Sequence, residues 1–221
     1  MNLLKTELCR HPIAKGFTGF IQCEKGTALL EFALSIGVLL LIFFGEVEMS
    51  RYVLIYQKVQ NVVSAETDNI TSINPGTIPL PISPTEMNNI LKAADIMMEP
   101  YTLTASNSQL MLTDIYFKPG DKPRVTWRYC NVSSLGQTSK FGVVGGAANL
   151  SSLPALPTKP NKFTMNSGDE IVVAEIFYNF SPIIVNNVTK SFLSTQIIYN
   201  FALSAPRYSL LNNLIINSNC N

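Results

Sequence analysis

The chain contains one run, residues 26–46 with the sequence GTALLEFALSIGVLLLIFFGE, that is apolar except for Glu31 and the closing Glu46. Residues 27–45 of this run would span about 28 Å as an α-helix, close to the hydrocarbon thickness of about 30 Å. This length predicts a membrane-spanning helix over residues 27–45, with a buried helix of a soluble core as the alternative. The helix places Glu31 within or at the edge of the bilayer, where an unpaired charge costs about 2.5–3.5 kcal/mol. Glu31 therefore needs a partner.

The flanks of the run predict its orientation. Residues 1–26 carry four basic and two acidic residues, a net charge of +2, whereas Glu46 and Glu48 follow the run. Basic flanks remain in the cytoplasm, so we expect a cytoplasmic N-terminus and an exported C-terminal part. A cleavable secretory signal is the obvious alternative, but the next residues, GEVEMSRY, lack the small residues that signal peptidase recognises. The expected arrangement is a single-pass, uncleaved membrane anchor.

The start of the apolar run carries a recognisable motif. From Gly26 to Phe32 the chain reads GTALLEF, a glycine followed by four residues, a glutamate and an aromatic residue. This motif resembles the prepilin-peptidase site of Flp-type pilins and TadE-like pseudopilins. The resemblance implies cleavage between Gly26 and Thr27, and assembly roles for Glu31 and Phe32. It also implies that Glu31 pairs with the free N-terminal ammonium of Thr27 in a neighbouring subunit, which would set an axial register. An ordinary anchor with a chance Glu31 is the alternative.

After the apolar run, residues 46–73 show the pattern of an amphipathic helix. Apolar residues recur at helical spacing, namely Tyr52, Ile55, Tyr56, Val59, Val62 and Val63. We expect this stripe to pack on the globular part of the chain rather than on another subunit. The breaker Asn-Pro-Gly at 74–76 predicts that the helix ends near Ser72. Residues 74–84 contain four prolines and predict a stiff extended connector.

Residues 85–221 are expected to form a periplasmic head that begins with a second helix. Ser83, Pro84 and Glu86 match the capping signature of a helix N-terminus, and Pro100 predicts its end. The apolar face of this helix is expected to comprise Ile90, Leu91, Ala94, Met97 and Met98.

Four stretches of the head carry strand patterns. Residues 109–117 and 123–130 flank a Pro-Gly-Asp-Lys turn and predict a hairpin, in which Val125, Trp127 and Tyr129 alternate with Arg124, Thr126 and Arg128. Residues 170–180 and 190–201 predict two further strands. Residues 131–169, rich in Ser, Gly, Pro and Asn, predict a surface excursion or a mobile loop. The expected fold class is α+β: a long N-terminal helix, transmembrane and then amphipathic, with a short second helix and an antiparallel sheet of about four strands.

The composition gives little support for catalysis. The chain has 16 basic and 15 acidic residues and a single histidine, His11, which cleavage after residue 26 would remove. The charge balance argues against nucleic-acid binding, and a chain without histidine lacks the commonest general base and metal ligand. We therefore predict no catalytic residue, no metal site and no cofactor. Three remaining groups receive structural interpretations: a strand entry for Asp169-Glu170, a flexible loop for Gly142, Gly145 and Gly146, and a solvated sheet face for Arg124, Thr126 and Arg128.

The four cysteines sort by predicted compartment. Cys9 and Cys23 fall in the cytoplasmic leader and are expected to be reduced. Cys130 and Cys220 fall in the exported part, where they either pair or remain two unpaired thiols. The Cys130–Cys220 disulfide is favoured, and closing a loop of about 90 residues is worth about 4–5 kcal/mol.

The motif, the basic leader and the long helix together predict a non-enzymatic TadE-like pseudopilin or minor pilin that acts in assembly of a tight-adherence (Flp/Tad) pilus. The resemblance implies three kinds of partner: a prepilin peptidase, other pilin or pseudopilin subunits with the Tad assembly platform, and the inner membrane. One alternative is an uncleaved bitopic scaffold or binding protein of the periplasm, in which Glu31 is incidental. A membrane-anchored enzyme is the other alternative.

Overall fold

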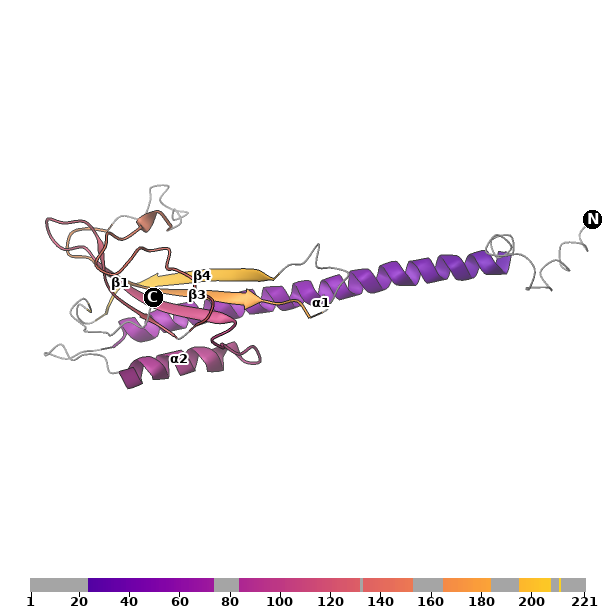
Figure 1. Ribbon diagram of the computed structural model, residues 1–221, viewed down its shortest axis with the longest axis horizontal. Helices are drawn as coiled ribbons and strands as arrows, with labels where there is room; N and C mark the ends of the chain where they lie inside the picture. The colour runs from indigo at the N-terminus through magenta and orange to yellow at the C-terminus, as the bar shows by residue number, and fades with distance from the viewer. Residues whose placement is uncertain are drawn as a thin grey trace, which may run out of the picture. The chain divides into compact units, whose positions relative to one another are not determined.

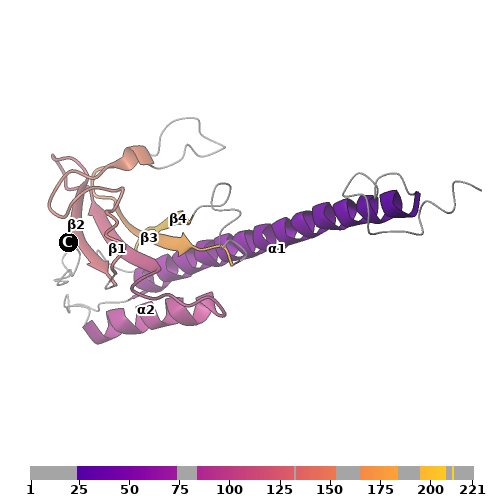
Figure 2. The ribbon, with the colours of Figure 1, turned by 45° about the vertical axis from the view of Figure 1, so that its right-hand side comes forward.

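The structure is a computed structural model that describes residues 24–73, 84–131, 133–152, 165–183, 195–207 and 211. The described residues include two helices, four strands and one 3-10 turn (Figures 1 and 2). In chain order these are α1 (Glu24–Thr71), α2 (Pro84–Met98), β1 (Ser108–Tyr116), β2 (Arg124–Cys130), η2 (Leu150–Ser152), β3 (Glu170–Phe180) and β4 (Gln196–Ser204). The chain divides into an N-terminal unit, residues 1–50, and a C-terminal unit, residues 51–221. The predicted α+β class, with its long first helix, short second helix and four-stranded antiparallel sheet, is confirmed.

Helix α1 begins earlier than predicted and ends where the sequence indicates. Its first residue is Glu24, three residues before the predicted start, because no helix breaker precedes the apolar run there. Its last residue is Thr71, and the Ser72 amide donates to the Asp68 carbonyl at 3.0 Å to close the final turn. The Asn-Pro-Gly breaker follows at once and accounts for the end.

In the C-terminal unit, one face of α1 is buried in the core. Its members follow helical spacing, and all are at most 1% exposed: Ile55, Val59, Val62, Val63 and Ile70. Tyr52 packs against the edge of this cluster. The prediction was wrong for Tyr56, which is exposed. Consecutive helical residues are about 100° apart, so the face that buries Ile55 turns Tyr56 outwards.

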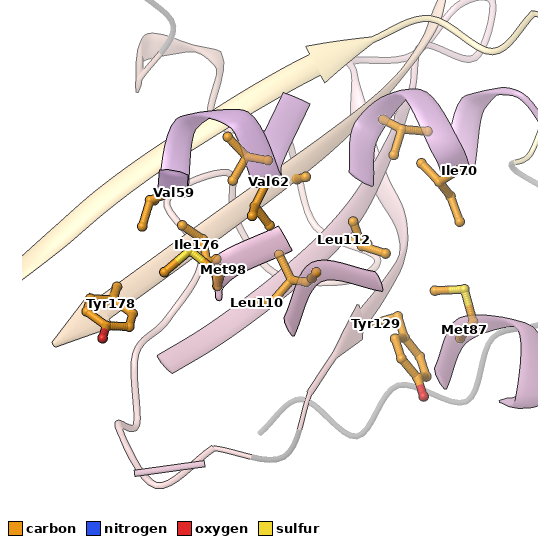
Figure 3. Packing of buried hydrophobic residues seen from close by; sticks show 14 of the residues in the cluster. Val59, Val62, Ile70, Met87, Met98, Leu110, Leu112, Tyr129, Ile176 and Tyr178 are labelled. Carbon is orange, nitrogen blue, oxygen red and sulfur yellow. The ribbon is translucent and has the colours of Figure 1, made fainter. Parts of the chain in front are cut away.

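Helix α2 covers the same core from beside α1 (Figure 3). It begins at Pro84 as predicted, while Ser83 lies outside the described residues. Its buried residues are Met87, Ala94 and Met98, with Ile90 and Leu91 half-buried, whereas Met97 is exposed against prediction. The ammonium of Lys58 donates to the carbonyls of Met97 and Glu99, at 3.4 and 2.6 Å. This α1 side chain therefore satisfies carbonyls at the C-terminus of α2 that have no intrahelical partner.

The sheet is antiparallel throughout, in the order β2-β1-β3-β4. The predicted β1–β2 hairpin is confirmed, and β3 matches the predicted residues 170–180. Strand β4 spans Gln196–Ser204 instead of the predicted 190–201, of which 190–194 lie outside the described residues. Its register explains the difference, because Gln196 pairs with Phe180, the last residue of β3, and pairing then continues to Ser204.

A bulge in the hairpin changes which residues of β2 share a face. Asp114 pairs with Trp127 but the next residue, Ile115, pairs with Val125, so Thr126 is the extra residue. As a result Trp127 joins the core beneath α1 and α2, and Val125 joins a second core on the opposite face of the sheet. The sequence predicted that Val125 and Trp127 share one face, and this was wrong because simple alternation contains no bulge.

The described part of the predicted surface excursion, residues 131–169, packs against one face of the sheet. The Phe141 side chain is fully buried and contacts the sheet face formed by Ile115, Val125, Ile171 and Val173, with Met165 beside them. Gly142 is held closely here, since its φ is +106° and an added Cβ would lie 2.8 Å from the Ala147 carbonyl oxygen. The described residues after β2 therefore form a covering layer, and the flexible-loop interpretation of Gly142 was wrong.

Candidate functional site

The residues of the GTALLEF motif all lie on the first turns of α1. The helical backbone runs through Gly26 and Thr27, and Glu31 follows Thr27 by four residues. That spacing places the two residues on one helix face, about 6 Å apart along the axis. The Glu31 side chain is exposed, and its backbone carbonyl accepts a hydrogen bond from the Ser35 hydroxyl at 2.8 Å. Phe32 is also exposed, so the Glu31 carboxylate and the Phe32 ring are both presented at the helix surface.

The helix that carries this motif exposes apolar side chains all around its axis. Every residue from Ala28 to Val47 is exposed, including the large side chains of Leu34, Leu41 and Phe43. Among the described residues, α1 is the one helix long and apolar enough to cross a membrane. A helix with apolar side chains exposed around its whole circumference is suited to a lipid environment. Moving apolar surface from water into lipid is favourable by about 25 cal/mol per Å².

Cys130 is the candidate disulfide residue that the structure describes. It ends β2, is buried with Met111 and Phe177, and is disulfide-bonded. Its predicted partner, Cys220, lies outside the described residues, so the Cys130–Cys220 pairing stays a prediction.

Sequence reasoning missed a buried polar cluster on the sheet face beneath the excursion. The fully buried Glu175 carboxylate accepts hydrogen bonds from the Ser139 hydroxyl, from the Lys140 amide at 3.0 Å and from the Tyr199 hydroxyl at 3.1 Å. The Lys140 ammonium lies 3.6 Å from the centre of the Tyr199 ring. Burial raises the pKa of Tyr199, and the Glu175 charge and hydrogen bond raise it further. These contacts fix residues 139–141 to β3 and β4.

Arg128 belongs to this buried layer, and the prediction that it lies on a solvated face was wrong. Its guanidinium donates to the Thr113 hydroxyl at 2.9 Å and to the Gly142 carbonyl at 2.7 Å. Burial lowers its pKa, and the Glu175 charge opposes this lowering. The nearby Arg124 is different: it is exposed and pairs with Asp121 at 2.7 Å. The residues that cover Arg128 belong to the excursion, and the composition of that segment is typical of a loop, so the sequence did not indicate that it would bury Arg128.

Two further buried carboxyl sites lie in the C-terminal unit. Burial raises the pKa of Asp114 to about 6, although hydrogen bonds from Thr126 and with the Glu170 carboxyl act in the opposite direction. Glu170 begins β3, as the strand-entry interpretation predicted. Burial alone raises the pKa of Glu66 on α1 to about 7, and neither of its carboxyl oxygens has a hydrogen-bond partner among the described residues.

These acids are enclosed, which limits the chemistry they can perform. Glu66, Asp114 and Glu175 have no exposed surface through which a substrate could approach. In the described part of the chain, no group of three or more His, Cys, Asp or Glu side chains is placed to hold a metal ion. The hydrogen bonds of Glu175 and Asp114 join neighbouring segments of the C-terminal unit, whereas Glu66 has no hydrogen-bond partner among the described residues.

The fold and the motif define a class: an α+β protein whose first helix is suited to anchoring in a membrane and carries a glutamate near its start. Within that class, residues 26–65 match the family model of TadE-like protein, which confirms for this segment the resemblance seen in GTALLEF. The match covers the motif, the apolar run and part of α1 in the C-terminal unit. No curated protein and no solved structure matches the chain. The family match and the apolar helix fit a membrane protein related to the Tad pilus.

Proposed function

We propose that this protein is a membrane-inserted pseudopilin or minor pilin that is processed by a prepilin peptidase and acts in assembly of a tight-adherence pilus. The observation that carries the proposal is the position of the GTALLEF motif: it lies at the start of an exposed apolar helix and inside the segment that matches TadE-like proteins. An ordinary membrane anchor that contains a glutamate by chance would not need a glycine separated from that glutamate by four residues. It would also not need to match the family model of TadE-like protein.

The proposed topology follows the charge and length of the segments. Residues 1–26 form the cytoplasmic leader, residues 27–45 cross the inner membrane, and residues 46–73 continue the helix into the periplasm. The Pro-rich connector, residues 74–84, then leads to the periplasmic head, residues 85–221. The net charge of +2 on the leader supports this orientation.

Cleavage between Gly26 and Thr27 requires the peptidase to reach a helical backbone. Both residues lie in the first turn of α1, which starts at Glu24. The first four amide groups of a helix have no intrahelical acceptor, and helix ends open at little cost in free energy. Gly26 adds no side chain to obstruct the approach of the enzyme. Cleavage at the proposed bond would therefore act where the helix is easiest to unfold locally.

Cleavage would also create the partner that Glu31 needs. The new α-amino group of Thr27 is positively charged, and the Glu31 carboxylate is exposed on the helix surface. In lipid each charge alone is costly, so an ammonium–carboxylate pair between neighbouring subunits would favour docking. Phe32, exposed beside Glu31, would add apolar contact at the same junction. The proposed partners are accordingly the peptidase, other pilin or pseudopilin subunits and the Tad assembly platform.

A pair of glycine substitutions tests the processing step. Gly26→Ala should leave the leader attached in cells with an active prepilin peptidase, because the added methyl group obstructs the cleavage site. Gly37→Ala is the matched control: Gly37 lies in the same helix, and nothing lies within 4 Å of an added Cβ. The control should be processed normally. Equal processing of both variants, measured as the mass of the membrane-extracted protein, would contradict the proposed site.

A further inference from the structure

Strand β2 forms one edge of the sheet, since the strand order is β2-β1-β3-β4 (Figure 2). The outer side of an edge strand carries backbone groups without a strand partner, and it can pair with another chain unless it is covered. Part of the excursion covers this edge at Val125. The Val125 amide donates to the Gly146 carbonyl at 3.1 Å, and its carbonyl accepts from the Gly145 amide at 2.8 Å. We name the outer side of the remaining residues, 126–130, the β2 edge.

The backbone of Arg128 points outwards at the β2 edge. The Asn131 amide donates to the Leu110 carbonyl at 3.1 Å, and residues that bond the neighbouring strand alternate with residues that point away from it. Arg128 lies opposite Thr113, three residues before Asn131, so its amide and carbonyl point away from β1. Among the described residues, no hydrogen bond reaches the Arg128 amide. Arg128 is nevertheless only 7% exposed, and buried backbone amides are nearly always paired.

Strand β2 is exposed at its start and enclosed at its end. Arg124 is exposed, whereas each residue from Trp127 to Cys130 is at most 7% exposed. Trp127 and Tyr129 belong to the core beneath α1 and α2, and Cys130 belongs to a cluster on the opposite face of the sheet. Both faces of this part of β2 are therefore covered, and only its outer edge still needs a cover.

The chain that follows β4 leads to the β2 edge. The Arg207 amide donates to the carbonyl of Thr71, the last residue of α1, at 3.0 Å. Four residues later, Leu211 is fully buried in the core, and its carbonyl accepts from the Trp127 indole N–H at 2.9 Å. Residues 212–220 follow directly and lie outside the described residues. They therefore start beside β2.

Cys130 provides a second point at which these residues are tied to β2. Cys130 is disulfide-bonded, and Cys220 is the other cysteine in the sequence of the C-terminal unit. With the predicted pairing, residues 212–220 lead from Trp127 to Cys130, a distance of about 10 Å along β2. Nine residues can reach about 30 Å when fully extended. Only about a third of them is therefore needed to follow the edge.

The composition of residues 212–220 divides in the same proportion. Residues 214–216 are Leu-Ile-Ile, which are apolar and include two residues that favour strands. They are preceded by Asn-Asn and followed by Asn-Ser-Asn, which favour turns. Three extended residues span about 10 Å, the length of the edge between Trp127 and Cys130. The sequence thus fits a turn, a short strand and a second turn.

We propose that residues 214–216 pair with the β2 edge as a fifth strand of the sheet. The new strand is parallel to β2, because both advance from Trp127 towards Cys130. It supplies an acceptor for the Arg128 amide and prevents a second copy of the chain from pairing with β2. The inference rests on the predicted Cys130–Cys220 disulfide, and it is independent of membrane insertion and of cleavage at Gly26.

The opposite edge of the sheet provides a reference amide. The Asn179 amide donates to the Asn107 carbonyl at 2.7 Å, so by the same alternation Val173 bonds β1. Leu203 lies opposite Val173, and its amide therefore points away from the sheet at the outer side of β4.

Residue-resolved hydrogen exchange of the full chain in detergent micelles tests the cover. We expect the Arg128 amide to be protected at least about tenfold more than the Leu203 amide, independently of protein concentration. Equal, weak protection of the two amides would overturn the proposal, because the β2 edge would then be open to water. Protection of Arg128 that rises with protein concentration would overturn it in favour of a second copy on the edge.

Two adjacent proline substitutions, Ile215→Pro and Ile216→Pro, test whether the cover is a strand. Neighbouring amides of a strand point to opposite sides, and proline is tolerated only where the amide faces outwards. One variant should lose at least about tenfold of the Arg128 protection, and the other should keep it. Both variants retain Cys220, and Trp127 fluorescence reports whether the unit is folded. The same effect from both substitutions would overturn strand pairing, and the wild-type comparison needs no substitution.

Discussion

Replacement of Glu175 by alanine is the sharpest test of how the C-terminal unit is held together. The carboxylate is fully buried and accepts hydrogen bonds from Ser139, Lys140 and Tyr199. Two of these donors belong to the excursion and one to β4, so a single side chain joins three segments. The variant leaves the three donors without their acceptor and removes the negative charge near the buried guanidinium of Arg128.

The expected loss follows from these contacts. Each hydrogen bond to a charged group contributes about 1.5–3 kcal/mol, and the donors left behind are partly able to reach water. Breaking one side of a buried charged cluster typically costs about 3–5 kcal/mol, which we take as the expected fall in the free energy of unfolding. For a unit of this size, a loss of 1 kcal/mol lowers Tm by about 2–4 °C. Glu175→Ala should therefore lower Tm by about 6–20 °C.

The single tryptophan makes this loss measurable in the full chain in detergent micelles. Trp127 is 3% exposed, and its indole N–H donates to the Leu211 carbonyl at 2.9 Å, so its fluorescence reports unfolding of the C-terminal unit. Asp68→Ala is the matched control, since Asp68 pairs with Arg207 at 3.1 Å but the two side chains are 62% and 56% exposed. The control should lose less than about 1 kcal/mol. Equal losses in the two variants would refute the role given to Glu175.

Three other predictions test separate parts of the account. Glu31→Ala should leave membrane insertion intact but abolish co-purification with other pilin subunits, whereas Glu46→Ala, which alters another exposed glutamate of α1, should retain it; normal pilus formation by Glu31→Ala would remove the proposed role. Burial raises the pKa of Glu66 from 4.5 to about 7, so the folded chain binds the proton more tightly and its stability should fall as pH rises from about 4.5 to about 7. Urea unfolding at several pH values measures this fall in the free energy of unfolding, which should be about 3 kcal/mol smaller in Glu66→Gln than in the wild-type protein. An unchanged pH dependence in the variant would contradict the raised pKa of Glu66. For Cys130 and Cys220, peptide mapping under non-reducing conditions should find the two linked, and free alkylatable Cys220 would disprove this pairing.

The local features of the chain were accessible from the sequence because their causes are local. The apolar run, the Asn-Pro-Gly breaker at 74–76 and Pro84 determine where α1 ends and where α2 begins. The β1–β2 hairpin follows from two alternating runs around a turn. The GTALLEF motif is likewise contiguous, and the family match to residues 26–65 confirms the resemblance it carries.

The buried polar cluster has causes that are distant in sequence. Arg128 looks solvated in an alternating strand, and only the excursion that returns through Gly142 makes it buried. The bulge at Asp114 depends on the pairing of two strands, so alternation within β2 alone cannot show it. One signal was present: β3 reads EIVVAEIFYNF, and a nearly continuous apolar strand is typical of burial on both faces. That pattern requires a second covering layer, which residues around Phe141 provide.

N-terminal sequencing of the wild-type protein, extracted from membranes of cells with an active prepilin peptidase, tests the central claim most directly. The account predicts a mature chain that starts at Thr27, so that Glu31 is its fifth residue. A protein that retains residues 1–26 in those cells would contradict the proposed processing and, with it, the ammonium partner assigned to Glu31.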